Sequence, residues 1–424
     1  MAASLLSVYA KPMRSKDHVL REVVESYLDS GDFNGRFTND RSYNDVELEL
    51  VGQLILEGTI EVVAEADFPN PSIRPWPSRR SAQDQVADLS RLTAHPIYLY
   101  PTNSALVQRQ EVVELSQEPY RQAMASGRGQ LELCFFECQV LEQYRNDPRF
   151  RYWFLDAEIH IGVSDGVYLD ELEPDRDKIG SVRVGVGYDM STIGTNLVRR
   201  FVCCFYRDLA DLTPEHQQRW KTFEIERLED YHPHPMWWEE MMGQWGDSIG
   251  PFQKIQLEME AINDLFGFSY AQSLFETTEL PRELGWVLRP STTEWHQFVL
   301  VLDKFLSDNL QHASLGVAGV DRNDAAGDPM GTLQRLEMYL TDAGLTSVQA
   351  RVLVDPFRFV RKERNAPAHK LAVPSTEPAL IARQRDILDL LIHSLIGIRR
   401  LLMTLPAAAN WTPDDLIEGK WYAL

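Results

Sequence analysis

The sequence predicts an α+β protein, with a β-rich, sandwich-like domain first and an all-α helical bundle last. Apolar residues alternate at every second position in several stretches before residue 206, and they recur every three or four positions after residue 290. The 424 residues are too many for one ordinary core. We therefore expect three parts: a β-rich sensing or regulatory domain over 1–206, a connector with helices over 207–289, and a helical bundle over 290–424.

Composition excludes several classes of protein. Hydrophobic residues make up 44% and charged residues 25%, the values of a soluble globular chain rather than a disordered one. No apolar run approaches the roughly 18 residues that cross a bilayer, and the first residues lack the charged and apolar regions of a signal peptide. Four cysteines are too few for a disulfide scaffold. We expect a cytoplasmic protein without a membrane partner.

The negative charge is unevenly distributed. The formal net charge is −21, and such an acidic surface repels nucleic acid. From Pro290 onward, however, the chain carries 14 basic and 16 acidic residues. The C-terminal third is therefore nearly neutral, and its charge does not exclude RNA as a partner.

The first part combines a helix with predicted strands. Ser15 to Asp29 has helical spacing of its apolar residues, and Val46 to Ala64 alternates apolar and polar residues as a half-buried strand does. Further strands are expected at about 131–142, 150–163, 166–170 and 179–188, with a tight turn at Asp165-Gly166. Residues 68–80 hold four prolines and predict an extended connection.

The connector gives irregular signals. Thr213-Pro214 predicts a helix start, with the hydroxyl as N-cap and the proline in the first turn. The stretch 231–245, rich in Trp, His, Pro and Met, is expected to wrap onto a neighbouring domain.

Four helices are predicted after residue 290. Ser291-x-x-Glu294 matches a capping box that opens a helix through Leu310. A Gly/Asp-rich loop over 316–331 precedes a second helix around 333–340, which Gly344 closes. A third helix covers 347–364 with a bend near Pro356, and a fourth covers 378–405. The leucine and isoleucine spacing of the fourth helix is that of a helix packed along a partner.

The end of the third predicted helix contains Arg364-Asn365-x-x-x-His369. This resembles the R-x4–6-H motif of HEPN domains, over roughly 290–405. The same spacing joins Arg227 to His232 and His234, and Arg289 to His296. The Arg364/His369 pair is preferred because it lies late in a predicted bundle, has a polar residue after the arginine, and has basic neighbours. The resemblance implies a small helical bundle, a homodimer with a shared cleft, and metal-independent RNA cleavage that leaves a 2′,3′-cyclic phosphate.

This chemistry suits the residue types. A histidine can move protons near neutral pH, and an arginine fork can stabilise negative charge on phosphate oxygens. Arg364, His369 and Asn365 are therefore the expected catalytic residues, without a metal or other cofactor. Substrate-binding candidates are Arg361, Lys362, Lys370, Asp308 and Asn309. The alternative for the motif is a basic helix end in which His369 caps a carbonyl.

Two interpretations of the first bundle helix stay open. Asp308 lies four residues after Lys304, so the pair can form an ordinary ion pair on a solvated face. In the other interpretation Asp308 or Asn309 reaches the Arg364 motif.

Three other groups are weaker candidates. His232 and His234, near Glu239 and Glu240, could form half of a zinc site, but a Pro-fixed surface turn is the preferred interpretation. The four cysteines are interpreted as buried apolar residues, with Cys134 and Cys138 on one face of a strand. The tryptophans at 237, 238 and 245 could stack bases, although packing or a protein interface is favoured.

The sequence thus gives three functional hypotheses. The first is a HEPN-type endoribonuclease of bacterial antiphage defence, abortive-infection or toxin type, acting on RNA such as tRNA and controlled by a regulatory protein or a phage-derived trigger. The second is a non-catalytic adaptor that dimerises through the bundle and binds a protein partner. The third is a metal hydrolase built on His232 and His234.

Overall fold

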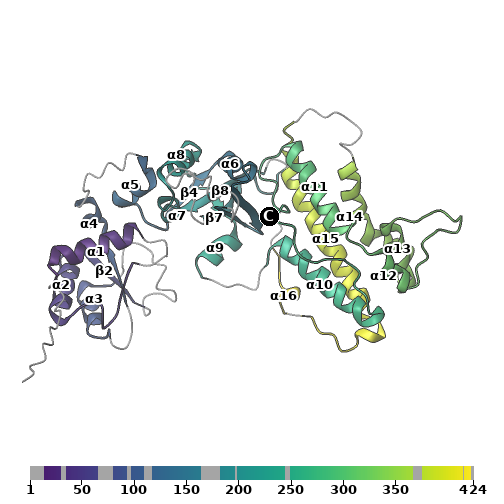
Figure 1. Cartoon of the computed structure of the whole chain (residues 1–424), viewed down its shortest axis with the longest axis horizontal. Helices are drawn as coiled ribbons and strands as arrows, with labels where there is room; N and C mark the ends of the chain where they lie inside the picture. The colour runs from purple at the N-terminus through teal and green to yellow at the C-terminus, as the bar shows by residue number, and fades with distance from the viewer. Residues whose placement is uncertain are drawn as a thin grey trace, which may run out of the picture. The chain divides into compact units, whose positions relative to one another are not determined.

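The computed structural model describes residues 14–29, 35–64, 80–92, 97–108, 117–163, 182–195, 198–243, 249–365, 375–413 and 415–421. These form two units (Figure 1). The first comprises Met1–Cys134, Asp170–Val182 and Cys204–Glu224, and the second comprises Phe135–Leu169, Arg183–Cys203 and Ile225–Leu424. The α+β class is confirmed. The predicted boundaries at 206 and 289 stay a prediction.

The first unit begins with a three-stranded sheet covered by helices. Its antiparallel strands, in the order β1-β3-β2, are β1 (Arg36–Thr38), β3 (Ile97–Pro101) and β2 (Ile60–Ala64). The helices of this region are α1 (Lys16–Leu28), α2 (Asp45–Leu56), α3 (Ala82–Leu89), α4 (Asn103–Gln108) and α5 (Pro119–Ala125). Valines and leucines of α1, α2, β2 and β3 are fully buried together, so this region has a core of its own.

The predicted strand over 46–64 is wrong in its first half. Residues 45–56 form α2, which begins with a capping box: Asn44 accepts from the Glu47 amide at 2.9 Å, and Glu47 accepts from the Asn44 amide at 3.1 Å. Alternate residues such as Val46 and Leu56 are exposed, whereas Val51 and Leu54 are buried at helical spacing. Helices predominate over strands in the described residues from 14 to 125, so the expected β-rich, sandwich-like start is corrected as well.

A second sheet has the order β5-β6-β7-β8-β4-β9, with β10 paired to β7. Its strands are β4 (Leu133–Phe136), β5 (Phe150–Leu155), β6 (Glu158–Val163), β7 (Val182–Asp189), β8 (Arg200–Phe205), β9 (Glu224–Ile225) and β10 (Tyr231–Pro233). Residues 150–163, predicted as one strand, form the two paired strands β5 and β6 with a turn at 156–157, and the strand predicted at 179–188 is confirmed from Val182, where the described residues resume. The one at 131–142 is confirmed only over β4, because residues 138–141 form a 3-10 turn. The strand 166–170 and the turn at Asp165-Gly166 lie outside the described residues.

Shorter helices follow these strands along the chain: α6 (Glu142–Asn146), α7 (Tyr206–Ala210), α8 (Pro214–Thr222) and α9 (Pro235–Met241). Thr213 occupies the predicted N-cap position of α8 with Pro214 after it, but its hydroxyl makes no capping hydrogen bond. The proline therefore marks this helix start, and the predicted hydroxyl cap is wrong.

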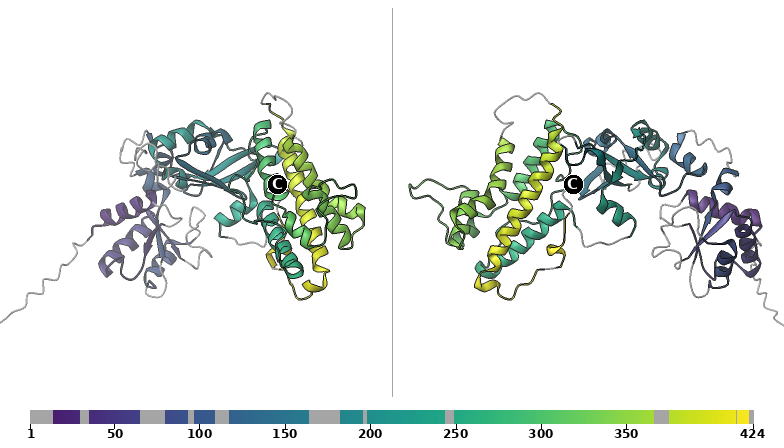
Figure 2. Two further views of the ribbon diagram at one scale, coloured as in Figure 1. Left: turned by 45° about the vertical axis from the view of Figure 1, so that its right-hand side comes forward. Right: turned by 180° about the vertical axis from the view of Figure 1, so that it is seen from behind.

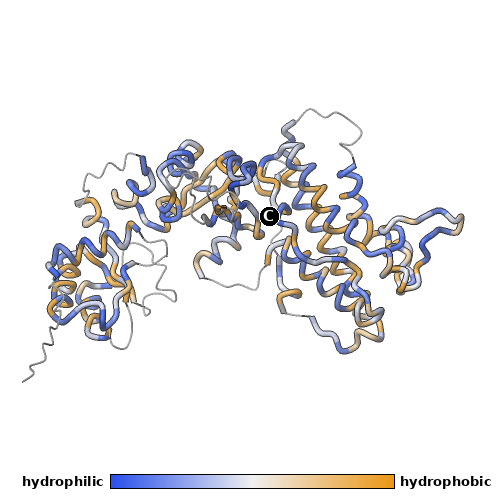
Figure 3. Tube along the Cα trace, viewed as in Figure 1, coloured by the Kyte–Doolittle hydropathy of each residue, from blue (hydrophilic) through white to orange (hydrophobic). Residues whose placement is uncertain are grey.

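The second unit contains a bundle of long helices (Figures 1 and 2). They are α10 (Pro251–Tyr270), α11 (Thr292–Leu306), α13 (Thr332–Asp342), α14 (Ser347–Asn365) and α15 (Ala379–Met403), with the short α12 (His312–Val317) and α16 (Asp415–Glu418). Helix α10 lies along α15, and α14 packs against α11, α13 and α15. The leucines and isoleucine of α15 whose spacing predicted a packed helix are fully buried, namely Leu388, Leu391, Leu395, Ile398 and Leu402. Apolar and polar segments alternate along the bundle helices (Figure 3).

The four helices predicted after residue 290 are confirmed as α11, α13, α14 and α15, and Gly344 has the left-handed backbone expected of a helix stop. Helix α10 was not predicted. The Ser291 hydroxyl caps α11 as expected, but the Glu294 carboxylate binds the amides of Leu288 and Arg289 instead of completing the box. Helix α11 ends at Leu306, four residues earlier than predicted.

The turn between β5 and β6 holds the start of α10. Asp156, in the left-handed region at φ 47°, accepts the amides of Phe252 and Gln253 at 3.0 and 3.2 Å. A Cβ on Gly250 would lie 2.0 Å from the Asp156 carboxyl carbon, so this approach requires glycine. Burial raises the pKa of Asp156 to about 6.

We expect Asp156→Asn to change how stability depends on pH. Between pH about 4 and 6 the native state holds a proton on Asp156 that the unfolded chain has released, so wild-type stability falls as pH rises. The fall amounts to roughly 3 kcal/mol for a shift of two pKa units. Urea unfolding at several pH values should show a flatter curve for the variant in this window.

Asp147→Asn is the control, because a hydrogen bond from Arg149 lowers the pKa of Asp147. The Asp147 carboxylate therefore stabilises the fold above its unfolded pKa and loses that effect as pH falls. If Asp156→Asn unfolds with the wild-type pH profile, the assigned protonation of Asp156 is wrong.

Candidate functional site

Arg364 lies in the last turn of α14, next to the end of α11. Its Nη1 donates to the Asp303 carboxylate at 2.6 Å and to the Asp308 carboxylate at 2.5 Å. The side chain is 29% exposed, so the guanidinium contacts both protein and solvent. The hydrogen bond to Asp308 raises the pKa of Arg364, while burial acts in the opposite direction.

Arg361, one turn earlier on α14, shares both carboxylates. Its Nη2 donates to Asp308 at 2.7 Å, and its Nε lies 3.5 Å from Asp303. Asp303 is fully buried and Asp308 is 43% exposed. Two arginines and two aspartates thus form a network of four charges, which we call the Arg364 cluster. The buried aspartate fixes the arginine side chains, and the exposed one lies at the solvent boundary.

The early end of α11 explains the partner of Asp308. A pair with Lys304 requires helical spacing between 304 and 308, but the helix stops at Leu306. The Asp308 carboxylate reaches Arg361 and Arg364 instead. The interpretation in which Asp308 contacts the motif arginine is therefore confirmed.

Asn309 has a structural role. Its amide nitrogen donates to the carbonyls of Thr277 and Phe305, and its oxygen accepts the Thr277 amide at 3.0 Å. The side chain is buried and both N–H donors are used. The assignment of Asn309 to substrate binding is therefore corrected: it holds the chain between α10 and α11 onto the end of α11.

The end of α14 is fixed from its other side by Glu363. The indole nitrogen of Trp295 donates to this carboxylate at 3.1 Å, and Arg383 pairs with it at 2.9 Å. Glu363 therefore links the ends of α14 to α11 and α15. Consecutive residues Glu363 and Arg364 attach this helix end at two points, which limits rotation of the arginine.

The remaining predicted residues divide into two groups. Lys362 and Asn365 are exposed at the end of α14, beside Arg364 in the sequence. His369 and Lys370 lie outside the described residues. The structure therefore brings together Arg361, Arg364 and Asp308 from the predicted set.

His234 and Trp237 have structural roles, and the surface turn predicted at His232 and His234 is wrong because β10 ends there and His234 is buried. His234 is buried, which lowers its pKa to about 3, and its Nδ1 accepts the Met236 amide as the N-cap of α9. His232 pairs with Tyr188 between β10 and β7. In the described part of the chain, no three His, Cys, Asp or Glu residues gather as a metal site. Trp237 is buried against Gly185, which supports the packing interpretation, and Trp245 lies outside the described residues.

All four cysteines are buried free thiols, as predicted. Cys138, however, begins the 3-10 turn and does not continue the strand of Cys134. Burial raises the pKa of both thiols, which makes them poor nucleophiles.

Comparisons with protein-family models, with curated proteins and with solved structures gave no match. Among the described helices, none has the length and apolar character needed to cross a bilayer. Any functional conclusion therefore depends on the residues and their geometry.

Proposed function

We propose that this protein is a metal-independent endoribonuclease of the HEPN type, with its site at the Arg364 cluster. The observation that carries the proposal is that Arg364 is both fixed by protein contacts and partly exposed to solvent. A buried aspartate fixes its guanidinium at the end of a bundle helix, and part of the side chain stays exposed to solvent. That combination suits an arginine that must meet a phosphate without first being ordered.

The hydrogen bonds of Arg364 leave donors for a substrate. Its bonds to Asp303 and Asp308 both start from Nη1. Within the described residues, these bonds use the two N–H groups of one nitrogen, which leaves the three N–H groups of Nε and Nη2 for phosphate oxygens. A guanidinium anchored through one nitrogen can present the other two as a fork to a phosphate.

His369 would supply the proton transfer. RNA cleavage without a metal requires removal of a proton from the 2′-hydroxyl and delivery of one to the leaving oxygen. One histidine and one arginine are too few for separate acid and base, so we propose that a second copy of the chain completes the cleft. Asn365 would orient His369 or bind phosphate, and Arg361, Lys362 and Lys370 would attract the RNA backbone.

The biological setting is part of the proposal. A nuclease of this type would act in bacterial antiphage or toxin-type defence, with the residues before the bundle sensing a trigger or regulating the site. We propose RNA as the class of substrate, and tRNA as one member of that class.

The experiment is an RNA-cleavage assay in EDTA with the full-length chain, using single-stranded RNA and tRNA substrates. We expect cleavage without added metal, and products that end in a 2′,3′-cyclic phosphate. Products with 3′-hydroxyl ends would contradict the mechanism. A chain that cleaves no RNA and binds one protein in a stoichiometric complex would instead support the adaptor hypothesis.

A further inference from the structure

A cavity of about 740 Å³ opens in the second unit, separate from the residues of the Arg364 cluster. Its walls come from the turn after β4, the start of β8, the chain entering α11, and the start of α15. They are formed by Glu137, Cys138, Gln139, Val198, Arg199, Arg200, Leu288, Arg289, Pro290, Ser291, Thr293, Thr376, Pro378 and Ile381. This volume is within the range of small-molecule sites.

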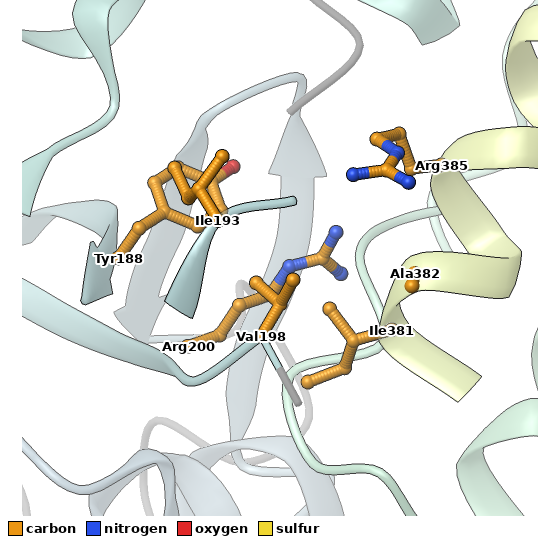
Figure 4. A pocket seen from close by; sticks show the side chains of 7 residues that line it. All are labelled: Tyr188, Ile193, Val198, Arg200, Ile381, Ala382 and Arg385. Carbon is orange, nitrogen blue, oxygen red and sulfur yellow. The ribbon is translucent and has the colours of Figure 1, made fainter. Parts of the chain in front are cut away.

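Arginines dominate the charge of this cavity. Among the residues that the structure describes, three arginines line it against one carboxylate, Glu137, in a chain whose net charge is −21. An adjoining pocket shares Arg200 and adds Arg385 (Figure 4). Figure 4 shows the guanidinium groups of Arg200 and Arg385 extending toward the same space from the sheet and from α15.

Each lining arginine is held in place by protein contacts. Arg200 is buried, and its Nη1 donates to the Val287 carbonyl and to the Gln384 side chain at 2.8 and 2.6 Å. Burial lowers the pKa of Arg200 to about 10, and the positive charge of Arg385 acts in the same direction. A bound anion would relieve that repulsion.

Arg199 and Arg289 are partly exposed at the cavity. Arg199 donates to Glu137 at 2.6 Å and to the Tyr231 hydroxyl at 2.7 Å, which uses two of its five N–H donors. Arg289 pairs with Glu142 and Glu294, both at 2.7 Å. These carboxylates are not among the lining residues, so they orient Arg289 without occupying the cavity.

The remaining walls provide apolar contact and neutral hydroxyls. Val198, Leu288, Pro290, Pro378 and Ile381 form the apolar part, and Ser291, Thr293 and Thr376 contribute hydroxyl groups. The helices α11 and α15, of 15 and 25 residues, both begin at this wall, and their N-terminal ends favour negative charge there.

We propose that this cavity binds a small nucleoside phosphate. Arg199 and Arg289 would receive the phosphate, since a guanidinium fork matches phosphate oxygens, with Arg200 contributing charge from the cavity wall. The apolar wall would cover the base, and the hydroxyls with Glu137 would meet the ribose. The proposal does not depend on RNA cleavage, because no residue of the Arg364 cluster lines the cavity.

Calorimetric titration of the full chain tests the proposal, with AMP, ADP, adenosine and inorganic phosphate as separate probes. We expect AMP or ADP to bind at least 10-fold more tightly than adenosine or phosphate alone. Arg199→Gln should weaken that binding by about 10-fold or more, because it removes a charge-assisted contact. Thr376→Trp, at an exposed residue of the wall, should block the cavity while keeping every charge.

Arg145→Gln is the matched control. Arg145 is partly exposed and pairs with Glu294 at 3.3 Å, as Arg289 does, but it does not line the cavity. If Arg145→Gln weakens nucleotide binding as much as Arg199→Gln does, the proposal is overturned. The absence of binding by both nucleotides at millimolar concentration would also overturn the proposal, and so would binding of AMP and ADP no tighter than that of inorganic phosphate.

Discussion

Replacing Glu258 with alanine should lower the free energy of unfolding by about 3–5 kcal/mol. Glu258 is fully buried on α10, 2.7 Å from the Arg399 guanidinium of α15 and 2.9 Å from Lys254 on its own helix. Both cations are buried as well. Removing the carboxylate leaves two positive charges in the bundle without their shared counter-ion. Among the carboxylates of the described residues, Arg399 then keeps only Glu418, at 2.8 Å.

Chemical denaturation of the variant and wild type measures this effect. Asp264→Ala is the matched control, because it removes an exposed carboxylate from the same helix and should change stability by no more than about 0.5 kcal/mol. Lys254 also donates to the Ile417 carbonyl, and this contact attaches α16 to α10. A loss below about 1 kcal/mol for Glu258→Ala would contradict the assigned role of the buried pair.

Replacing Arg364 with alanine should lower the RNA-cleavage rate by about 10²–10³-fold. That range is typical when one donor that stabilises transition-state charge is removed. Alanine also removes a partner of the buried Asp303, so some loss of stability is expected. Arg364→Lys separates the two effects, since it keeps a positive charge beside Asp303 but not the planar fork.

We expect Arg364→Lys to unfold close to wild type and still to cleave RNA slowly. The control is Arg351→Ala, which removes an exposed arginine from the start of the same helix, where its partner is Asp355. If Arg364→Lys restores the full rate, the guanidinium fork has no catalytic role. If Arg351→Ala reduces the rate equally, general attraction of RNA explains the effect.

The sequence predicted the secondary structure best where the spacing of apolar residues determines which side chains are buried and how they pack. The long helix α15 and the turn at Gly344 follow from apolar periodicity and a glycine stop, and both are confirmed. At α2 the alternation of apolar residues favoured a strand, but Asn44 and Glu47 form a capping box that begins a helix. Capping is local chemistry, and Asn44 and Glu47 are the sequence signal that could have identified this helix.

Long-range contacts could not be read from the sequence in the same way. The burial of Asp303 beneath Arg361 and Arg364 depends on how α11 and α14 pack, which the sequence of α11 alone does not determine. Helix α10 was not predicted, although Pro251 in its first turn and the buried residues Ile255, Met259, Ile262 and Phe266 follow helical spacing. Arg199 and Arg200 of the cavity are adjacent in the sequence, but Arg289 comes from the distant chain entering α11, so no local spacing joins it to them.

Cleavage of RNA by His369→Ala in EDTA tests the central claim most directly. If Arg364 and His369 together perform the reaction, the variant should cleave about 10²–10⁴-fold more slowly than wild type, the usual contribution of a general acid or base. His393→Ala, at an exposed histidine of α15, should keep the wild-type rate. A His369→Ala protein that cleaves as fast as wild type, with the same products, would show that the nuclease site proposed at the end of α14 is wrong.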